Sequence, residues 1–234
     1  MQAALITGGT KGFGLALAES LVQDGWSVVI DGRDPTALDD ALRRLVTMSR
    51  DQMVRGVAGD VADPAHRAAL LASVDTIGRL DLLVNNASTL GPSPQPHLAT
   101  YPLDEFQRVL QVNVVAPLAL VQATLPLLRT HHGAIVDVTS DAAVEGYEGW
   151  GGYGSSKAAL EQLSNVLAAE EPDVRVYWFD PGDMRTEMHQ AAFPGEDISD
   201  RPLPEMVVPV LRRLLNDAPP SGRFRGAQSP EVAP

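Results

Sequence analysis

Residues 3–14 read Ala3-Ala4-Leu5-Ile6-Thr7-Gly8-Gly9-Thr10-Lys11-Gly12-Phe13-Gly14, a short apolar run followed by a glycine-rich turn. The sequence that follows predicts a helix over residues 14–24. Glycines at such a joint let the backbone N–H groups approach a pyrophosphate at the positive end of the helix dipole. The stretch is typical of the first strand and turn of a dinucleotide-binding sheet, although turn formation by itself also favours glycine.

The same alternation continues along the chain. Six apolar runs predict strands buried on both faces, at residues 3–6, 28–30, 53–57, 80–84, 134–138 and 174–179. Amphipathic segments predict helices at residues 14–24, 36–48, 64–77, 104–129, 153–170 and 204–216. Repeated alternation predicts an α/β fold: a Rossmann-like, doubly wound parallel sheet in a three-layer αβα arrangement. We expect residues 1–226 to form one domain that includes the substrate site, and residues 227–234 to be a flexible tail.

Composition excludes several classes of protein. The chain of 234 residues has no cysteine, so disulfide and thiolate chemistry are excluded. Its net charge of -12 and scattered Lys and Arg disfavour binding to nucleic acid. The first residues lack the pattern of a signal peptide, and no stretch is expected to span a membrane, so a cytoplasmic protein is expected. No metal site is expected from the dispersed histidines, His66, His97, His131, His132 and His189.

The candidate catalytic residues are Tyr153, Lys157, Ser140 and Asn113. Tyr153 and Lys157 lie one helical turn apart, and a cation beside a phenol favours the phenolate. Ser140 follows a predicted strand, where its hydroxyl could bind the same substrate oxygen. Asn113 lies in a mostly apolar helix and is either a structural clamp or part of a proton path. An exposed tyrosine–lysine pair is the alternative interpretation of that spacing.

Two further motifs follow predicted strands. Asn85-Asn86-Ala87-Ser88 leaves room for a flat cofactor, or is simply an Asx turn. Asp31 lies about 20 residues past the glycine turn, where an acid would bind a ribose 2′-hydroxyl and favour NAD.

The chain resembles the single-domain short-chain dehydrogenase/reductase family from about residue 3 to about residue 215. The motifs that carry this resemblance appear in the family's order: Gly8-x-x-x-Gly12-x-Gly14, Asp60, Asn85-Asn86-Ala87, Asn113, Ser140, Tyr153, Lys157, and Pro181-Gly182 with Thr186. The chain departs from the family at Ser88, where glycine is usual, around Ser140 and Tyr153 (residues 141–152), and at residues 222–226, which replace an apolar, glycine-rich finish. Because that last region commonly helps to build the family's tetramer, a homodimer or a homotetramer is expected.

The resemblance implies a role for each catalytic candidate. Tyr153 would donate or accept the proton, and Lys157 would lower its pKa while binding the nicotinamide ribose. Ser140 would polarise the carbonyl, and Asn113 would hold a water linking Lys157 to solvent. The residues expected to bind the cofactor are Gly8, Thr10, Lys11, Gly12, Phe13, Gly14, Arg33, Asp60, Val61, Asn86, Ala87, Tyr153, Lys157, Pro181, Gly182 and Thr186.

The resemblance also bears on the choice of cofactor. In the family register the acid of NAD-dependent members falls at Gly32, and Arg33 falls where NADP-dependent members keep a basic residue. Lys11 adds a second cation, so NADP(H) is expected over NAD(H). The alternative is that Arg33 pairs with Asp34 or Asp31 on the surface.

The expected function is therefore an NAD(P)-dependent oxidoreductase that interconverts a carbonyl and an alcohol, with NADPH-dependent reduction of a medium-sized hydrophobic ketone or aldehyde preferred. Residues 89–94, 144–150 and 184–193 are expected to form partly apolar substrate walls. Two alternatives remain: a silent dinucleotide-binding sensor or scaffold, and an epimerase or dehydratase with a retained cofactor.

Overall fold

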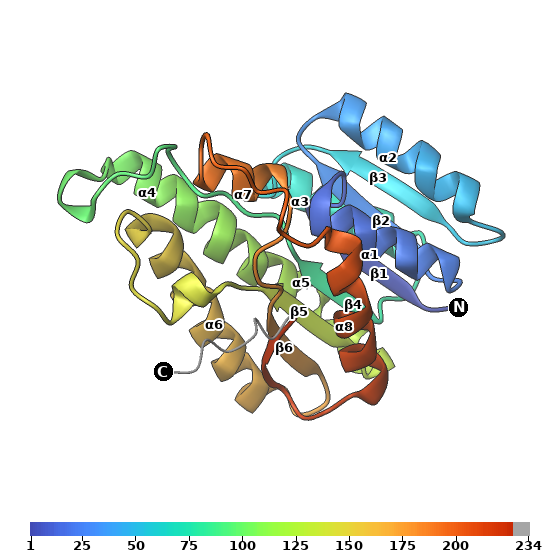
Figure 1. Cartoon of the computed structure of the whole chain (residues 1–234). Helices are drawn as coiled ribbons and strands as arrows, with labels where there is room; N and C mark the ends of the chain where they lie inside the picture. The colour runs from blue at the N-terminus through green and yellow to red at the C-terminus, as the bar shows by residue number, and fades with distance from the viewer. Residues whose placement is uncertain (227–234) are drawn as a thin grey trace.

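A computed structural model describes residues 1–226 and shows one sheet of seven parallel strands in the order β3-β2-β1-β4-β5-β6-β7 (Figure 1). The strands are β1 (Ala3–Ile6), β2 (Ser27–Gly32), β3 (Val54–Ala58), β4 (Leu82–Asn85), β5 (Ala134–Val138), β6 (Arg175–Asp180) and β7 (Gly222–Arg225). The predicted tail, residues 227–234, lies outside the described residues. The doubly wound parallel sheet predicted from the sequence is confirmed.

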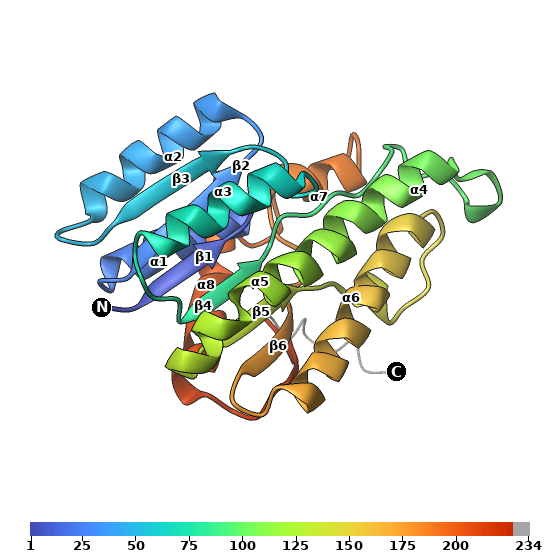
Figure 2. The ribbon, with the colours of Figure 1, turned by 180° about the vertical axis from the view of Figure 1, so that it is seen from behind.

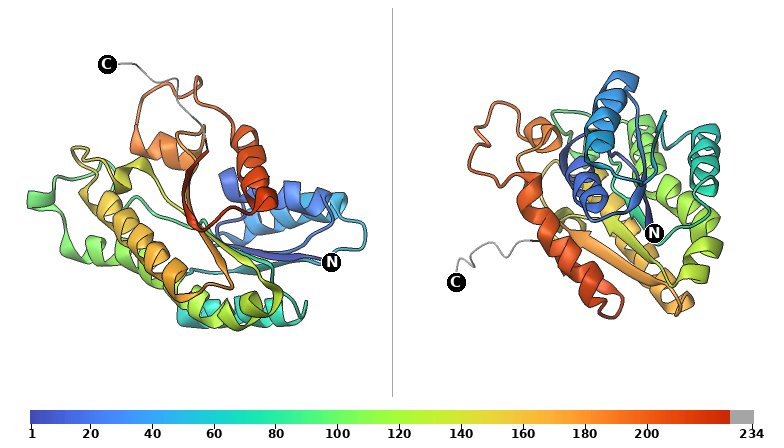
Figure 3. Two further views of the ribbon diagram at one scale, coloured as in Figure 1. Left: turned by 90° about the horizontal axis from the view of Figure 1, so that it is seen from below. Right: turned by 90° about the vertical axis from the view of Figure 1, so that its right-hand side faces the viewer.

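Helices cover both faces of the sheet. They are α1 (Gly12–Gln23), α2 (Pro35–Met48), α3 (Pro64–Asp75), α4 (Leu103–Leu110), α5 (Ala116–His131), α6 (Gly151–Glu170), α7 (Glu187–Ala192) and α8 (Pro204–Asp217). One apolar core joins α1, α2 and α8 to the first face (Figure 1), and a second joins α3, α5 and α6 to the other (Figure 2). Seen from below, the sheet lies between these two helical layers (Figure 3). This is the expected three-layer αβα arrangement.

Local sequence fixes where α2 and α3 begin. Asp34 and Asp63 cap these helices by accepting hydrogen bonds from the backbone N–H groups of Thr36 and Ala65. In each case proline occupies the first helical position, where its missing N–H costs nothing. The chain therefore turns from strand into helix at defined residues.

The strands differ in burial. Every residue of β1, β2, β4 and β5 is buried, as expected for central parallel strands. The prediction that the 53–57 strand is buried on both faces is wrong, because every residue of β3 is half-buried or exposed. The reason is its position at the edge of the sheet, where it pairs only with β2.

β7 is a strand that the sequence pattern does not reveal. Its residues, Gly222-Arg223-Phe224-Arg225, carry two charges and one apolar side chain. It pairs with β6 in parallel, and the Phe224 ring lies 5.6 Å from that of Tyr177. Because charged edge strands lack an apolar run, periodicity alone does not identify them.

The predicted helix over residues 104–129 is interrupted. A five-residue π-helical segment, Gln111–Val115, separates α4 from α5. Leu103–His131 is, within residues 1–226, one helix long and apolar enough to cross a membrane by length and composition. This one helix does not overturn the expectation that no stretch spans a membrane, because 44% of its most apolar window is buried inside the protein and the core helix of a soluble protein passes the same test.

The order of the strands places a crevice above β1 and β4. From β1 the strand order runs to β2 and β3 on one side, and from β4 to β5, β6 and β7 on the other, so the order reverses between β1 and β4. Ligands of doubly wound sheets bind at the carboxyl ends of the strands at such a point. The glycine turn follows β1, Asn86 follows β4, and Ser140 closely follows β5. The fold therefore gathers the sequence motifs at one edge.

Candidate active site

A cleft of about 980 Å³ opens at this edge, a volume in the range of small-molecule and cofactor sites. Most of the predicted site residues line it: Gly8, Thr10, Lys11, Gly12, Phe13, Arg33, Asp60, Val61, Asn86, Ala87, Ser140, Tyr153, Lys157, Pro181, Gly182 and Thr186. Gly14 and Asn113 do not line the cleft. Gly14 packs against the backbone of Gly8, and Asn113 binds Thr89 and Ser156, so both support residues of the cleft wall.

The glycine turn has the geometry that an anion cradle requires. Gly8 and Gly12 have φ angles of 66° and 56°, a region that favours glycine. A Cβ at Gly14 would lie 2.4 Å from the Gly8 carbonyl oxygen, so no larger residue fits. The first turn of α1 contains no acidic residue, and Lys11 at its N-cap makes no side-chain capping bond. The backbone N–H groups there are thus suited to a pyrophosphate.

Asn86 fastens the glycine turn to the end of β4. Its Nδ2 donates to the carbonyl oxygens of Thr7 and Gly8 at 2.9 and 3.0 Å. In return, the Thr7 hydroxyl accepts from the backbone N–H groups of Asn86 and Ala87 at 3.1 and 3.0 Å. Asn86 and Ala87 therefore lie in the cleft wall as predicted, and the Asn86 amide also has a structural task.

Asp31 is a buried structural residue. One carboxylate oxygen accepts from the Gly8 N–H at 2.6 Å, and the other lies 2.9 Å from Nε2 of His66. Both oxygens are thereby engaged at a side chain that is 1% exposed. This geometry argues against Asp31 as a ribose ligand, and no local pattern pairs it with His66, 35 residues away.

At the end of β2, a side chain at position 32 would displace that of Thr10. A Cβ at Gly32 would lie 2.3 Å from Cγ2 of Thr10. Arg33 follows with an exposed side chain at the cleft. Lys11 forms an ion pair with Glu187 of α7, and both side chains are exposed, so the pair is weak.

Asp60 and Val61 line the far end of the cleft. Asp60 accepts from the Ala62 N–H at 2.9 Å and pairs with Arg108 of α4. Partial burial acts to raise the pKa of Asp60, but the Ala62 N–H and the Arg108 guanidinium outweigh it and hold that pKa below its usual value. Asp60 therefore faces any ligand as a carboxylate, and Arg108 is a cleft residue that the sequence analysis missed.

Lys157 is buried beside Tyr153 on α6. Its Nζ donates to the Val138 carbonyl at 2.7 Å and lies 5.5 Å from the centre of the Tyr153 ring. Burial lowers the pKa of Lys157 to about 8, against the opposing effect of the Asp137 and Glu161 carboxylates. The exposed tyrosine–lysine pair is excluded, since both side chains are in the protein interior.

The Tyr153 phenol is held in its protonated form. Burial raises its pKa above the usual value, and the Asp180 and Asp141 carboxylates act in the same direction. The Ser140 and Ser88 hydroxyls oppose this by hydrogen bonding. At neutral pH the group is thus a proton donor, and a nearby positive charge would be needed to make it a ready acceptor.

Asn113 is a clamp with all four amide positions used. Its Oδ1 accepts from the Ser88 hydroxyl and the Thr89 N–H at 3.1 and 2.9 Å. Its Nδ2 donates to the Thr89 carbonyl and to Oγ of Ser156, both at 2.9 Å. The clamp interpretation is observed, whereas a water held by Asn113 stays a prediction. Ser88, a departure from the family pattern, joins this clamp to the phenol of Tyr153.

The substrate side of the cleft is partly apolar. Leu90, Ala142 and Tyr153 form a buried cluster against which Trp150 and Met188 pack. The Trp150 ring lies 5.8 Å from that of Tyr153. Trp150 lies in the expected substrate wall at residues 144–150 and lines the cleft.

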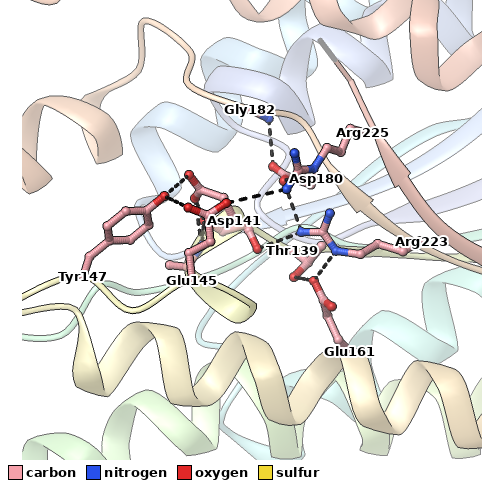
Figure 4. Close-up of polar contacts among 11 residues, drawn as sticks. Thr139, Asp141, Glu145, Tyr147, Glu161, Asp180, Gly182, Arg223 and Arg225 are labelled. Atoms are coloured by element: carbon pink, nitrogen blue, oxygen red, sulfur yellow. Dashed lines mark hydrogen bonds and ion pairs between the residues drawn. The ribbon is translucent and has the colours of Figure 1, made fainter. Parts of the chain in front are cut away.

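Charged side chains close the opposite side. The Ser140 hydroxyl donates to Asp141 at 2.8 Å, and the Tyr147 hydroxyl donates to Asp141 and Glu145 (Figure 4). Tyr147 therefore anchors acids and does not line the cleft. Arg223 of β7 reaches the same region, and its sole signal in the sequence was the unusual finish at residues 222–226. Within residues 1–226, no three metal-ligating side chains group together.

A family model described as short chain dehydrogenase matches residues 2–197. The chain belongs to the short-chain dehydrogenase family. It is 33% identical over 199 residues to a sepiapterin reductase of Mus musculus, covering 80% of this chain and 76% of the relative. It is 36% identical over 187 residues to a serine 3-dehydrogenase of Agrobacterium fabrum, covering 78% and 72%.

Solved structures of short-chain dehydrogenases agree with the observed fold. A short chain dehydrogenase of Escherichia coli complexed with NADPH superposes with a TM-score of 0.89 at 29% identity, covering 97% of each chain. This short-chain dehydrogenase is thus a member of an oxidoreductase family that acts on small molecules, and some of the solved structures it resembles are complexed with NADP or NADPH.

Proposed function

We propose that this short-chain dehydrogenase interconverts a carbonyl and an alcohol with NADP(H), and that reduction of a small ketone or aldehyde is its working direction. The observation that carries the proposal is a protonated, buried Tyr153 in the cleft, with Ser140 and Lys157 beside it. Carbonyl reduction requires a general acid within hydrogen-bonding distance of the substrate oxygen.

Each residue has a distinct part in the proposed reaction. A bound nicotinamide supplies the hydride. Ser140 turns its hydroxyl from Asp141 to the substrate oxygen, and Tyr153 donates its proton to that oxygen. Lys157 brings a positive charge beside the phenolate that remains and binds the nicotinamide ribose. Asn113 keeps the 88–89 backbone and α6 in register through its side-chain amide, and the water that returns a proton to Lys157 would be held by a backbone group of Asn113, since that amide is fully engaged.

The cofactor preference is supported by the end of β2. Asp31 is engaged with Gly8 and His66, and position 32 carries no acid, since it is a glycine packed against the Thr10 side chain. Arg33 is exposed at the cleft, where a guanidinium matches a 2′-phosphate by charge and shape. Lys11 supplies a second cation once its exposed pair with Glu187 opens.

The substrate is a small, partly hydrophobic molecule, because Leu90, Trp150, Met184, Met188 and Ala192 line the cleft near Tyr153. Residues 1–226 act as one domain that carries both cofactor and substrate sites. We further propose a cytoplasmic homodimer or homotetramer that binds neither nucleic acid nor membranes and needs no metal.

Cofactor absorbance across a panel of ketones and aldehydes, with NADPH and NADH compared, tests the proposal. Net oxidation of NADPH, at higher catalytic efficiency than NADH, is expected. Binding without consumption would identify a silent sensor or scaffold, and product without net consumption an epimerase or dehydratase. A clear NADH preference would overturn the assignment of Arg33, and activity on polyanionic carbonyls alone would overturn the substrate class.

A further inference from the structure

Arg223 connects three elements around the catalytic serine. It lies on β7, at the edge of the sheet, with a side chain that is 21% exposed. Its Nε donates to Oε1 of Glu161 on α6 at 2.9 Å. Its Nη2 donates to the backbone carbonyl of Ser140 at 3.1 Å and to Oδ2 of Asp180 at 3.2 Å. One guanidinium thus bridges α6 and the carboxyl ends of β5 and β6.

Both carboxylates that Arg223 binds also accept a hydrogen bond from a residue close to the active site (Figure 4). Oδ1 of Asp180 accepts from the Gly182 N–H at 3.0 Å, which fixes the turn at Pro181-Gly182. Oε1 of Glu161 accepts from the Thr139 hydroxyl at 2.7 Å, in the residue before Ser140. Arg223 therefore holds Ser140 directly through its carbonyl, and indirectly through Thr139.

The planar guanidinium is suited to this position. It offers five N–H donors in a fixed plane, whereas lysine offers one compact ammonium. Asp180 and Glu161 are 6% and 12% exposed, so removing their cation would leave two poorly solvated carboxylates close together. Arg225, two residues along the strand, is 54% exposed and approaches Asp180 only to 3.7 Å.

We propose that Arg223 is a positioning residue that fixes Ser140, at the end of β5, relative to the Pro181-Gly182 turn, at the end of β6. Resting on the proposed function, this would orient a substrate carbonyl bound by Ser140 relative to a nicotinamide held at the Pro181-Gly182 turn. Arg223 touches neither reacting group, so its effect passes through Ser140 and Asp180.

Hydrogen exchange tests the positioning role without reference to activity. Arg223→Met should accelerate exchange about tenfold in peptides covering residues 136–145 and 177–186, and leave residues 3–14 unchanged. Arg225→Met removes the same charge from the same strand and is the matched control, with a smaller change expected. Unchanged exchange in Arg223→Met would overturn the proposal.

Kinetics test its consequence for the reaction. With NADPH and para-nitrobenzaldehyde, or whichever carbonyl the wild-type enzyme reduces, kcat of Arg223→Met should fall about ten- to a hundredfold, because small misplacements of reacting groups are costly. The Kd for NADPH and the KM should change less than about threefold. Arg223→Lys should recover part of kcat, since it keeps the charge without the planar set of donors.

The outcomes separate the two proposals. No reductase activity in the wild-type enzyme would contradict the proposed function, while the exchange result would still decide the role of Arg223. Wild-type kcat in a folded Arg223→Met variant would overturn the positioning role. If Arg223→Met does not fold, Arg223→Lys decides by the same measurements, with faster exchange and lower kcat expected than in wild type.

Discussion

The two halves of the cleft are held together by different interactions. In the nucleotide half, glycines shape the backbone, and Asp31 and Asn86 bind backbone groups of the glycine turn. In the catalytic half, ionic groups are buried: Lys157 lies beneath Tyr153, and Arg223 binds Asp180. The first half depends mainly on the shape of the backbone. The second depends on charge, so its function should respond to pH and to single charge removals.

The largest expected effect is in the catalytic half. Tyr153→Phe removes the proton donor and should lower kcat at least about a thousandfold, within the range of general acid catalysis. The Kd for NADPH, measured by fluorescence titration, should stay within about twofold. Tyr177→Phe is the control, because it removes a hydroxyl that donates to the Pro219 carbonyl, outside the lining of the cleft. Wild-type turnover in Tyr153→Phe would refute the mechanism.

The next largest effect is expected at Arg33, in the nucleotide half of the cleft. Arg33→Ala should lower kcat/KM for NADPH about ten- to a hundredfold, because it removes a charge-assisted hydrogen bond to the 2′-phosphate. The kcat/KM for NADH should be nearly unchanged. Arg50→Ala, an exposed arginine in the turn before β3, should alter neither. An equal loss with both cofactors would show that Arg33 does not bind the 2′-phosphate.

A third prediction uses pH. Burial lowers the pKa of Lys157 to about 8, so raising the pH through that value removes the ammonium. Tyr153 remains protonated over this range, so kcat/KM for reduction should fall by about tenfold per pH unit above about pH 8. Because the Asp137 carboxylate raises the pKa of Lys157, Asp137→Asn should move this limb to lower pH. Glu170→Gln, at the exposed end of α6, should not, and an unmoved limb in Asp137→Asn would reject the assignment.

The smallest effect on cofactor choice is expected at Asp31. Asp31→Ala leaves the Gly8 N–H and His66 without their partner, which should lower the free energy of unfolding by about 1–3 kcal/mol. The ratio of kcat/KM for NADPH to that for NADH should not change. Asp39→Ala, exposed on α2, controls for loss of a carboxylate, and a selective loss of NADH activity would restore Asp31 as a ribose ligand.

Much of the site could be predicted because its residues follow predicted strands. Parallel strands bring their carboxyl ends to one edge, so Ser140, Asn86 and Pro181-Gly182 had to lie near one another. The roles of Asp31 and Arg223 could not be predicted in the same way. Their partners His66 and Ser140 lie 35 and 83 residues away, and no local pattern pairs them.

The sequence by itself determined the α/β alternation, the glycine turn and the residue types of the catalytic group. These follow from local causes: strand and helix periods, backbone angles open to glycine, and caps such as Asp34. The tertiary structure alone decided that Asn113 is a clamp, that Lys157 is buried, and that β7 brings Arg223 to Ser140. The physical reason is that burial and hydrogen-bond partners arise only when distant segments pack, and these set the pKa of Tyr153 and Lys157.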